Sequence, residues 1–329
     1  MKYSVIIPVY NRPAEVGELL ESIAGQPRPD VEIIIVEDGS QTTCEEVVAR
    51  FQNRLNITYL KKENGGPAAA RNYGAQQASG EWLIILDSDV VLPPGYFEAV
   101  DSGTENLGCD AFGGPDKAAD SFTPIQKAIS YAMTSFFTTG GIRGGKKKMD
   151  KFYPRSYNMG IRSEVYRKLG GFAKMRFGED IDFSYRIVEN GYKACLIPGA
   201  WVWHKRRTDF RKFFKQVHNS GIARINLEKR HPGTMKLVHM LPAAFTIGCL
   251  VFITGAFFCL WSFLPLMLYA LLVFLGSLAQ NKSLKVALLS VPAAFIQLTG
   301  YGTGFIVASV RRYILKGKEF EAFKDNFYK

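Results

Sequence analysis

The sequence predicts an α/β fold, with a Rossmann-like doubly wound domain followed by C-terminal transmembrane helices. Strand-like and helix-like segments alternate over residues 5–86, the order that builds a mostly parallel sheet. Between Glu228 and Glu319 the chain has no Asp or Glu, and this gap contains apolar runs at 237–279 and 286–310. A helix needs about 20 apolar residues to cross a bilayer core. We therefore expect an α/β domain at 1–236, a membrane domain of two or three helices at 237–310, and a basic tail at 311–329.

The elements of the α/β domain follow from apolar patterning. Short apolar runs predict buried strands, and apolar residues spaced i, i+3, i+4, i+7 predict a helix face. Pro13 opens the first helix, where Val16, Leu19, Leu20 and Ile23 have that spacing. In chain order the sequence predicts strand 5–9, a helix from 13, strand 31–36, a polar helix through 47–48, strand 57–60, an Ala-rich helix at 67–78, and strand 82–86.

Residues 100–150 are less regular. The stretch at 140–148 is rich in Gly and Lys without periodicity, so we expect a mobile loop; a lid that binds phosphates or head groups is the alternative. Helix and strand patterns resume at Ser163. Gly178 precedes a predicted helix with Ile181, Tyr185 and Val188 on one side.

Composition restricts the partners and the location. The net charge is +11, and basic residues flank the apolar runs at 205–215 and 311–318, as the positive-inside rule requires of cytoplasmic flanks. Such charges also attract anionic lipids and phosphorylated ligands. No nucleic-acid-binding motif accompanies them, so we expect no nucleic acid partner. The five cysteines are scattered, and the N-terminus begins as a strand and not as a signal peptide. We expect a multi-pass protein of the cytoplasmic (inner) membrane, with its α/β domain in the cytoplasm.

The candidate site residues follow the strands, because ligands of such sheets bind at the carboxyl ends of the strands. Pro8-Val-Tyr-Asn-Arg12 follows the first strand and Glu37-Asp-Gly-Ser40 the second. Asp87-Ser-Asp89 directly follows the fourth strand. Two carboxylates at that spacing can bind Mg²⁺ or Mn²⁺, which neutralises a leaving diphosphate.

Five motifs in this order resemble the family 2 glycosyltransferases, which have the GT-A fold. They are Val5-Ile-Ile-Pro-Val-Tyr-Asn-Arg12, Val36-Glu-Asp-Gly-Ser40, Asn64-Gly-Gly-Pro-Ala-Ala-Ala-Arg-Asn72, Asp87-Ser-Asp89 and Gly178-Glu-Asp-Ile-Asp-Phe-Ser-Tyr-Arg186. The resemblance covers roughly residues 3–210. It implies an inverting, Mg²⁺- or Mn²⁺-dependent sugar transfer from a nucleotide-sugar donor, of which a UDP-sugar is the family's common choice. With the apolar runs, it implies a membrane-attached enzyme similar to bacterial exopolysaccharide and cell-surface glycan transferases, acting on a lipid-linked glycan acceptor.

The resemblance also implies which residues hold the nucleotide. Pro8, Tyr10 and Asn11 are expected at the donor site, with Glu37 and Asp38 beside them and Asp38 at the edge of the base. The family usually has Asp-Asp at the last two positions, so Glu37 is a departure.

Four further residues complete the expected donor and metal site. Arg71 is expected to reach the nucleotide or its phosphates, and an arginine on a helix surface is the alternative. Asp87 is expected to contact the ribose or the sugar, and Asp89 to ligate the metal. His204 is expected to help bind the metal or the diphosphate, although a single histidine is often structural.

Glu179 and Asp180 resemble the motif that holds the catalytic base of the family. An inverting transfer needs a carboxylate that accepts the proton of the attacking hydroxyl. Asp180 falls in the first turn of a predicted helix, where the helix dipole favours the ionised form, so we expect it to be the base and Asp182 to cap the helix. Processive synthases of the family carry Gln-x-x-Arg-Trp; the nearest segment here, Gln216-Val-His-Asn-Ser220, lacks the last two residues, which disfavours a processive polymerase.

The number of membrane spans stays open. The first run has a predicted break near Cys259, before Pro265, and two spans would return the chain to Lys282 and Lys285 on the cytoplasmic side. The second run either spans once, or is broken at Pro292 and its glycines and dips in or lies at the interface. The Tyr301–Phe305 patch resembles a feature of membrane-attached exopolysaccharide transferases.

Two other functions stay open. A polyprenyl-phosphate sugar synthase would use a lipid phosphate as nucleophile and would need no base. A non-catalytic membrane scaffold with a transferase-like domain is the second alternative, which the intact Asp87, Asp89 and Asp180 disfavour.

Overall fold

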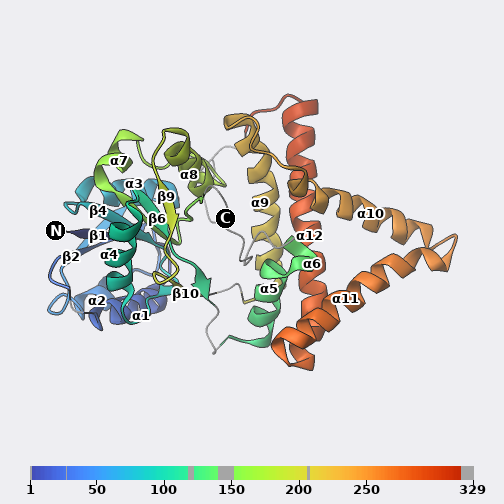
Figure 1. Ribbon diagram of the computed structural model, residues 1–329, viewed down its shortest axis with the longest axis horizontal. Coiled ribbons are helices and arrows are strands. Elements are labelled where there is room, and N and C mark those ends of the chain that lie inside the picture. Colours follow the sequence, from blue (N-terminus) through green and yellow to red (C-terminus); the bar gives the residue numbers. More distant parts are fainter. Residues whose placement is uncertain (1, 27, 118–121, 140–151, 206–207, 320–329) are drawn as a thin grey trace. The chain divides into compact units, whose positions relative to one another are not determined.

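A computed structural model describes residues 2–26, 28–117, 122–139, 152–205 and 208–319 (Figure 1). These form two compact units. The first holds residues 2–117 and 152–205, and the second holds 122–139 and 208–319. The units do not follow the boundary expected at residue 236, because 122–139 and 208–236 belong with the apolar helices and not with the sheet. The Gly- and Lys-rich stretch at 140–148 lies outside the described residues.

The first unit is built on a seven-stranded sheet in the order β3-β2-β1-β4-β8-β6-β9. The four predicted strands are confirmed, and they pair in parallel. The sheet is mixed beyond them, since β8 is antiparallel to both β4 and β6. The strands are β1 (Tyr3–Val9), β2 (Val31–Asp38), β3 (Ile57–Lys62), β4 (Trp82–Leu86), β6 (Ala111–Gly113), β8 (Asn158–Arg162) and β9 (Ala194–Leu196); a small second sheet holds β5 (Val90–Val91), β10 (Val202–His204) and β7 (Asp116–Lys117).

Helices cover both faces of the large sheet. One buried cluster includes residues of α1 (Pro13–Ala24), α2 (Glu45–Ala49) and α4 (Tyr96–Leu107). The opposite cluster includes residues of α3 (Pro67–Gln77), α7 (Ser163–Lys168) and α8 (Glu179–Glu189). The helix α4 lies in the region that the sequence left without assignment. Because β1, β2 and β4 are parallel, their carboxyl ends point in the same direction and lie next to one another.

The second unit is entirely helical in its described residues. It holds α5 (Pro124–Thr134), α6 (Phe136–Thr139), α9 (Phe210–Arg230), η1 (Leu237–His239), α10 (Leu241–Gly255), η2 (Leu260–Phe263), α11 (Leu264–Asn281), α12 (Leu284–Ser309) and the π-helical turn η3 (Val310–Ile314). The predicted break near Cys259 is confirmed by the turn between α10 and α11. The second apolar run is not broken: α12 continues through Pro292 as one helix. Two segments, Leu260–Asn281 and Leu284–Ile314, are long and apolar enough to cross a membrane.

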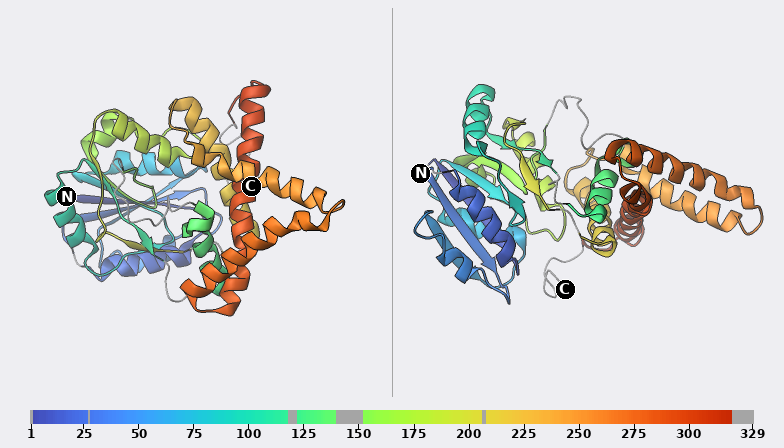
Figure 2. Two further views of the ribbon diagram at one scale, coloured as in Figure 1. Left: turned by 45° about the vertical axis from the view of Figure 1, so that its right-hand side comes forward. Right: turned by 90° about the horizontal axis from the view of Figure 1, so that it is seen from below.

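The glycines of α12 serve close helix packing. A Cβ atom on Gly304 would lie 2.0 Å from the carbonyl oxygen of His218 in α9, and one on Gly302 would lie 2.3 Å from that of Pro242 in α10. The backbones therefore touch where a side chain would separate them. Figure 2 shows α9 and α12 side by side from two further directions. The Tyr301–Phe305 patch thus lies in a helix–helix contact.

Candidate functional site

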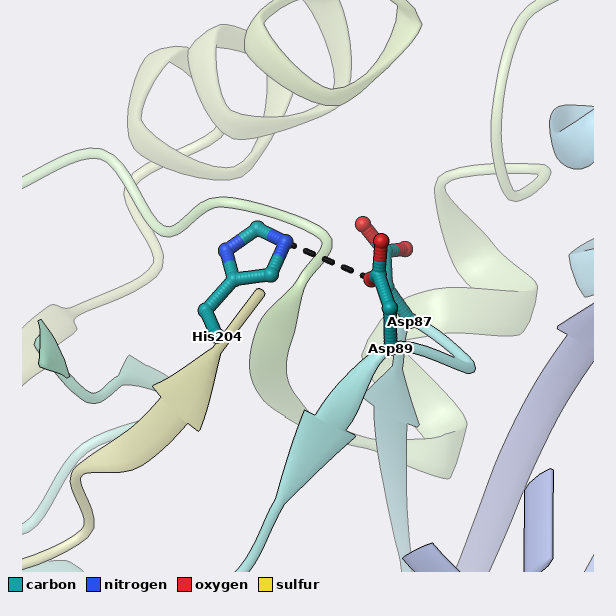
Figure 3. A group of neighbouring side chains, drawn as sticks. All are labelled: Asp87, Asp89 and His204. Carbon is teal, nitrogen blue, oxygen red and sulfur yellow. Dashed lines mark ion pairs between the residues drawn. The ribbon is translucent and has the colours of Figure 1, made fainter. Parts of the chain in front are cut away.

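Three side chains that the sequence singled out converge in the first unit. Asp87 and Asp89 follow β4, and His204 ends β10, which pairs antiparallel with β5 just after Asp89. Figure 3 shows the two carboxylates next to each other, with the imidazole edge directed at them. Each of the three offers one atom that can ligate a metal, and these atoms lie within 4.8 Å of one another. His204 Nε2 is 3.3 Å from Asp89 Oδ1. Carboxylate oxygens with one imidazole nitrogen suit a cation such as Mn²⁺ or Mg²⁺.

The charge state of this cluster is set by its cations. Burial acts to raise the pKa of Asp89, but His204 and Arg12, which donates to the Asp89 carboxylate, hold that pKa well below its usual range. Burial acts to lower the pKa of His204, but the neighbouring carboxylates of Asp116 and Asp89 outweigh it and raise the pKa to about 9. Because a metal ligand must be the neutral imidazole, cation binding here requires His204 to release a proton.

Asp116 and Tyr157, which the sequence did not single out, are neighbours of His204. Asp116 Oδ2 lies 3.8 Å from His204 Nδ1 on the side away from Asp89. The Tyr157 ring stacks on the imidazole with a 5.1 Å centroid separation, and its hydroxyl lies 3.4 Å from Asp116 Oδ1. A carboxylate on the second nitrogen fixes the ring orientation of a metal-ligating histidine. The sequence carries no signal for this contact, because it arises from the pairing of β7 with β10.

We expect Asp116→Asn to weaken Mn²⁺ binding by about 10- to 100-fold, the usual effect of losing such a partner. The measurement is a titration of free Mn²⁺ by electron paramagnetic resonance, with no donor sugar and therefore no turnover. Asp110→Asn is the matched control, because Asp110 accepts from Lys193 N and is not part of the cluster. Equal Mn²⁺ affinities in the two variants would contradict a positioning role.

Arg71 joins two acidic motifs. Its Nη2 donates to Asp87 at 2.9 Å and its Nη1 donates to Glu179 at 3.0 Å, while only 4% of its side chain is exposed. Burial acts to lower the pKa of Arg71, but the charges of Asp87 and Glu179 outweigh it and keep the guanidinium ionised. Arg71 is therefore neither on a helix surface nor free to point into solvent. It holds the end of β4 against the start of α8; a contact with the nucleotide stays a prediction.

We expect Arg71→Met to destabilise the chain by about 3–5 kcal/mol, because it leaves two partly buried carboxylates without their cation. The measurement is urea unfolding of the detergent-solubilised protein. Arg54→Met is the control: Arg54 also pairs with a glutamate, Glu21, but both side chains are about half exposed, so no measurable change is expected. Equal effects of the two substitutions would show that Arg71 does not stabilise the contact between the end of β4 and the start of α8.

Glu179 and Asp180 begin α8 and differ in their environments. Burial and the charge of Asp180 raise the pKa of Glu179. Burial also acts to raise the pKa of Asp180, but Arg155, whose Nε lies 2.7 Å from Asp180 Oδ2, outweighs it and lowers that pKa. Asp182 is paired with Arg186 at 2.9 Å and is 3% exposed. Asp180 thus differs from Glu179, whose pKa is raised, and from Asp182, which is paired with Arg186 of the same helix.

Asp38 and Glu37, expected at the nucleotide, are held by neighbouring loops. Asp38 is 1% exposed; it accepts from Lys62 Nζ at 2.7 Å and from the backbone N–H groups of Gly65 and Gly66 at 2.9 and 2.8 Å. Glu37 accepts from Cys44 N at 2.8 Å and from the Tyr59 hydroxyl at 2.7 Å. These carboxylates fix the loops that border the strand ends. Their contact with a nucleotide stays a prediction.

The remaining predicted residues are Pro8, near the end of β1, and Tyr10 and Asn11, on the loop that follows it. Asn11 has a left-handed backbone (φ 53°), and its Oδ1 accepts from the N–H groups of Gln41 and Thr42 at 2.7 and 2.9 Å. It thereby ties the first loop to the loop after β2. Pro8 and Tyr10 are partly exposed beside it. Of the predicted set, the structure brings together Asp87, Asp89 and His204, and links Asp87 to Glu179 through Arg71.

Comparison with known proteins agrees with this geometry. The family model described as glycosyl transferase family 2 matches residues 4–170. The poly(ribitol-phosphate) β-N-acetylglucosaminyltransferase TarS of Staphylococcus aureus is 39% identical over 93 residues, which are 27% of this chain and 16% of TarS. An uncharacterized glycosyltransferase of Haemophilus influenzae is 31% identical over 194 residues, 56% of this chain and 62% of that protein. The matched stretches span less than two thirds of these relatives, and less than a fifth of TarS.

Solved structures share the fold. The mannosyltransferase PcManGT from Pyrobaculum calidifontis, in complex with GDP-Man and Mn²⁺, matches with a TM-score of 0.64 at 18% identity, covering 90% of this chain and 87% of that one. S. aureus TarS 1–349 matches with a TM-score of 0.51 at 19% identity, covering 95% and 92% of the two chains. At these identities the likeness shows the fold alone, and it supports the GT-A-like α/β fold expected from the sequence.

Proposed function

The chain belongs to glycosyl transferase family 2, and we propose that it transfers a sugar, with inversion, from a nucleotide-sugar donor to an acceptor hydroxyl. The observation that carries the proposal is the convergence of Asp87, Asp89 and His204, joined to the Glu179-Asp180 motif through Arg71. The proposal is supported because side chains suited to a cation and a carboxylate with a lowered pKa both belong to the first unit, and an inverting transfer needs these two kinds of group.

Each group has a distinct role in this proposal. Asp87, Asp89 and His204 would hold a divalent cation, which when bound would supply positive charge to offset that of the leaving diphosphate. Asp180 accepts the proton of the acceptor hydroxyl as the oxygen attacks the anomeric carbon. Arg155 keeps Asp180 ionised at neutral pH, and Arg71 fixes the distance between the two motifs. Asp38, Asn11 and Tyr10 border the nucleotide.

The acceptor is proposed to be a lipid-linked glycan. The support is the second unit, in which two segments are long and apolar enough to cross a membrane and large apolar side chains are exposed on α10 and α11. The chain would then act at the cytoplasmic membrane in cell-surface polysaccharide synthesis, with UDP-sugar as donor. TarS and the minor teichoic acid biosynthesis protein GgaB of Bacillus subtilis, which is 38% identical over 104 residues, are named for roles of this kind.

A second candidate is favoured by one contact. Arg155 forms an ion pair with Asp180, so an acceptor that approaches Asp180 also approaches a guanidinium. A polyprenyl phosphate would pair with Arg155 and, being already an anion, would need no base. The two candidates differ in whether Asp180 is needed.

The test is a donor screen on detergent-solubilised protein. Nucleotide sugars are supplied with Mn²⁺ or Mg²⁺, and release of nucleoside diphosphate is measured with and without a membrane lipid extract. Release from one donor that requires both the metal and the extract supports the proposal and identifies the sugar. Absence of release from every donor under every metal condition would refute it and favour the non-catalytic scaffold.

A further inference from the structure

We propose that the second unit enters the bilayer from one side only: the α10–α11 hairpin, residues 241–281, ends inside the hydrocarbon, and α12 lies at the interface without crossing. This inference rests on the membrane attachment proposed above. Figure 1 shows α10 and α11 leaving α12 and meeting at a turn away from the rest of the unit. The two helices contact α12 through Phe245 and Tyr269, which both pack against Phe295, and through Ser277, which is bonded to Ser290.

The turn of the hairpin suits hydrocarbon and not water. Its side chains are the most exposed apolar groups of this segment, with Phe257 85%, Phe258 93%, Leu260 81% and Trp261 77% exposed. A turn that emerged into water beyond the bilayer would expose all four. The segment 255–263 contains no Asp, Glu, Lys or Arg that would anchor it on the far side.

Five backbone N–H groups of the turn have partners within the protein, as lipid requires. In hydrocarbon every N–H needs a partner within the protein. The N–H groups of Ala256, Phe257 and Phe258 donate to Phe252, Thr254 and Gly255, and those of Cys259 and Ser262 donate to Gly255 and Cys259. The hydroxyls of Thr246 and Thr254 donate to carbonyls of their own helix.

The first arm is too short for a full crossing. Its helix α10 has 15 residues. At 1.5 Å per residue it measures about 22 Å, against a hydrocarbon core of about 30 Å. The second arm, Leu260–Asn281, is long enough to cross, but a hairpin reaches no deeper than its shorter arm. The turn therefore lies past the middle of the bilayer and within it.

The helix α12 is prevented from spanning by α9, which lies along it. His218 Nδ1 of α9 is 3.1 Å from Thr303 Oγ1, and Lys229 Nζ lies 4.4 Å from the centre of the Tyr313 ring. The outer side of α9 exposes Arg211, Lys212 and Lys215. If α12 crossed the bilayer, α9 would carry these charges into the hydrocarbon, which strongly disfavours charged groups. At the interface the same face meets lipid head groups and water.

Basic residues at the helix ends agree with entry from one side. Lys282 lies between α11 and α12, Lys285 lies in the first turn of α12, and Arg311, Arg312 and Lys318 follow α12. A spanning α12 would place one of these groups outside, against the positive-inside rule. With α12 at the interface, every basic group stays on the cytoplasmic side and can contact anionic lipids.

Thiol labelling of the full chain in bacterial membranes tests this topology. Lys285→Cys and Lys318→Cys are each made with Cys259→Ser, and a membrane-impermeant maleimide is added to intact spheroplasts and to inside-out vesicles. The native protein provides a third reporter at the turn: Cys259 is exposed, whereas the other four cysteines are buried. We expect the introduced thiols at positions 285 and 318 to react only in inside-out vesicles, and Cys259 to react from neither side until the protein is unfolded in detergent.

Each other outcome overturns a defined part of the inference. Reaction of the thiol at position 318 in spheroplasts would show that α12 spans the bilayer. Reaction of native Cys259 in spheroplasts would show that the hairpin crosses. Release of the protein from membranes by alkaline carbonate would instead refute the proposed attachment itself, while leaving sugar transfer to be judged by the donor screen.

Discussion

Asp89→Asn is expected to reduce metal-dependent release of nucleoside diphosphate by about 10³-fold or more, since a bound cation contributes several kcal/mol of charge stabilisation. Asp89 is the most enclosed carboxylate of the cluster at 8% exposed, and it contacts both His204 and Arg12. An amide keeps the size of the side chain but removes the charge that balances Arg12 and either the protonated His204 or a bound metal. The measurement is initial rates over a range of Mn²⁺ concentrations, with the donor that the screen identifies.

The matched control is Glu45→Gln, which also removes one carboxylate that is paired with a cation, here Lys61 on an exposed surface. Its rate should equal that of the unaltered protein. If Asp89→Asn retained its rate at saturating Mn²⁺, the cluster would not be the metal site of the reaction. A thermal melt of each variant separates loss of chemistry from loss of fold.

Asp180→Asn is expected to lower the transfer rate to a hydroxyl acceptor by about 10²- to 10⁴-fold, the usual contribution of a general base. Mn²⁺ binding should be unchanged, because Asp180 is not part of the cation cluster. Retention of most of the activity would remove the base role and favour the phosphate acceptor. A parallel loss of Mn²⁺ binding would indicate that the substitution disturbs the fold around α8.

The pH dependence gives a further measure of the same pair. Arg155 lowers the pKa of Asp180, so the base is ionised above a pH that lies below the usual range of an aspartate. Removal of this cation in Arg155→Gln should raise that pKa, and the acid limb of the kcat/KM profile should move to higher pH by about 1–3 units. Arg162→Gln, which removes an arginine paired with Asp110 at 3.8 Å, should leave the profile in place.

The fold of the first ninety residues was accessible from sequence because its signals are local. Apolar runs of strand length, Pro13 and Pro67 at helix starts, and acids directly after strands identify the elements and the edge that carries the site. The same local signals located the turn near Cys259. They left residues 100–150 unassigned, because α4 and α5 have short apolar faces, although Gly108 ends α4 and a capping box at Thr123 begins α5.

The sequence by itself determined the family motifs, the Asp87/Asp89/His204 set and the apolar character of the C-terminal helices. Only the tertiary structure decided which charges meet. Arg71 takes Asp87 and Glu179, which lie far apart in the chain, as its two partners, and Asp116 reaches His204 because β7 pairs with β10. It likewise decided that α12 packs along the basic helix α9. Such contacts depend on strand order and helix packing, which bring together residues that no local spacing relates.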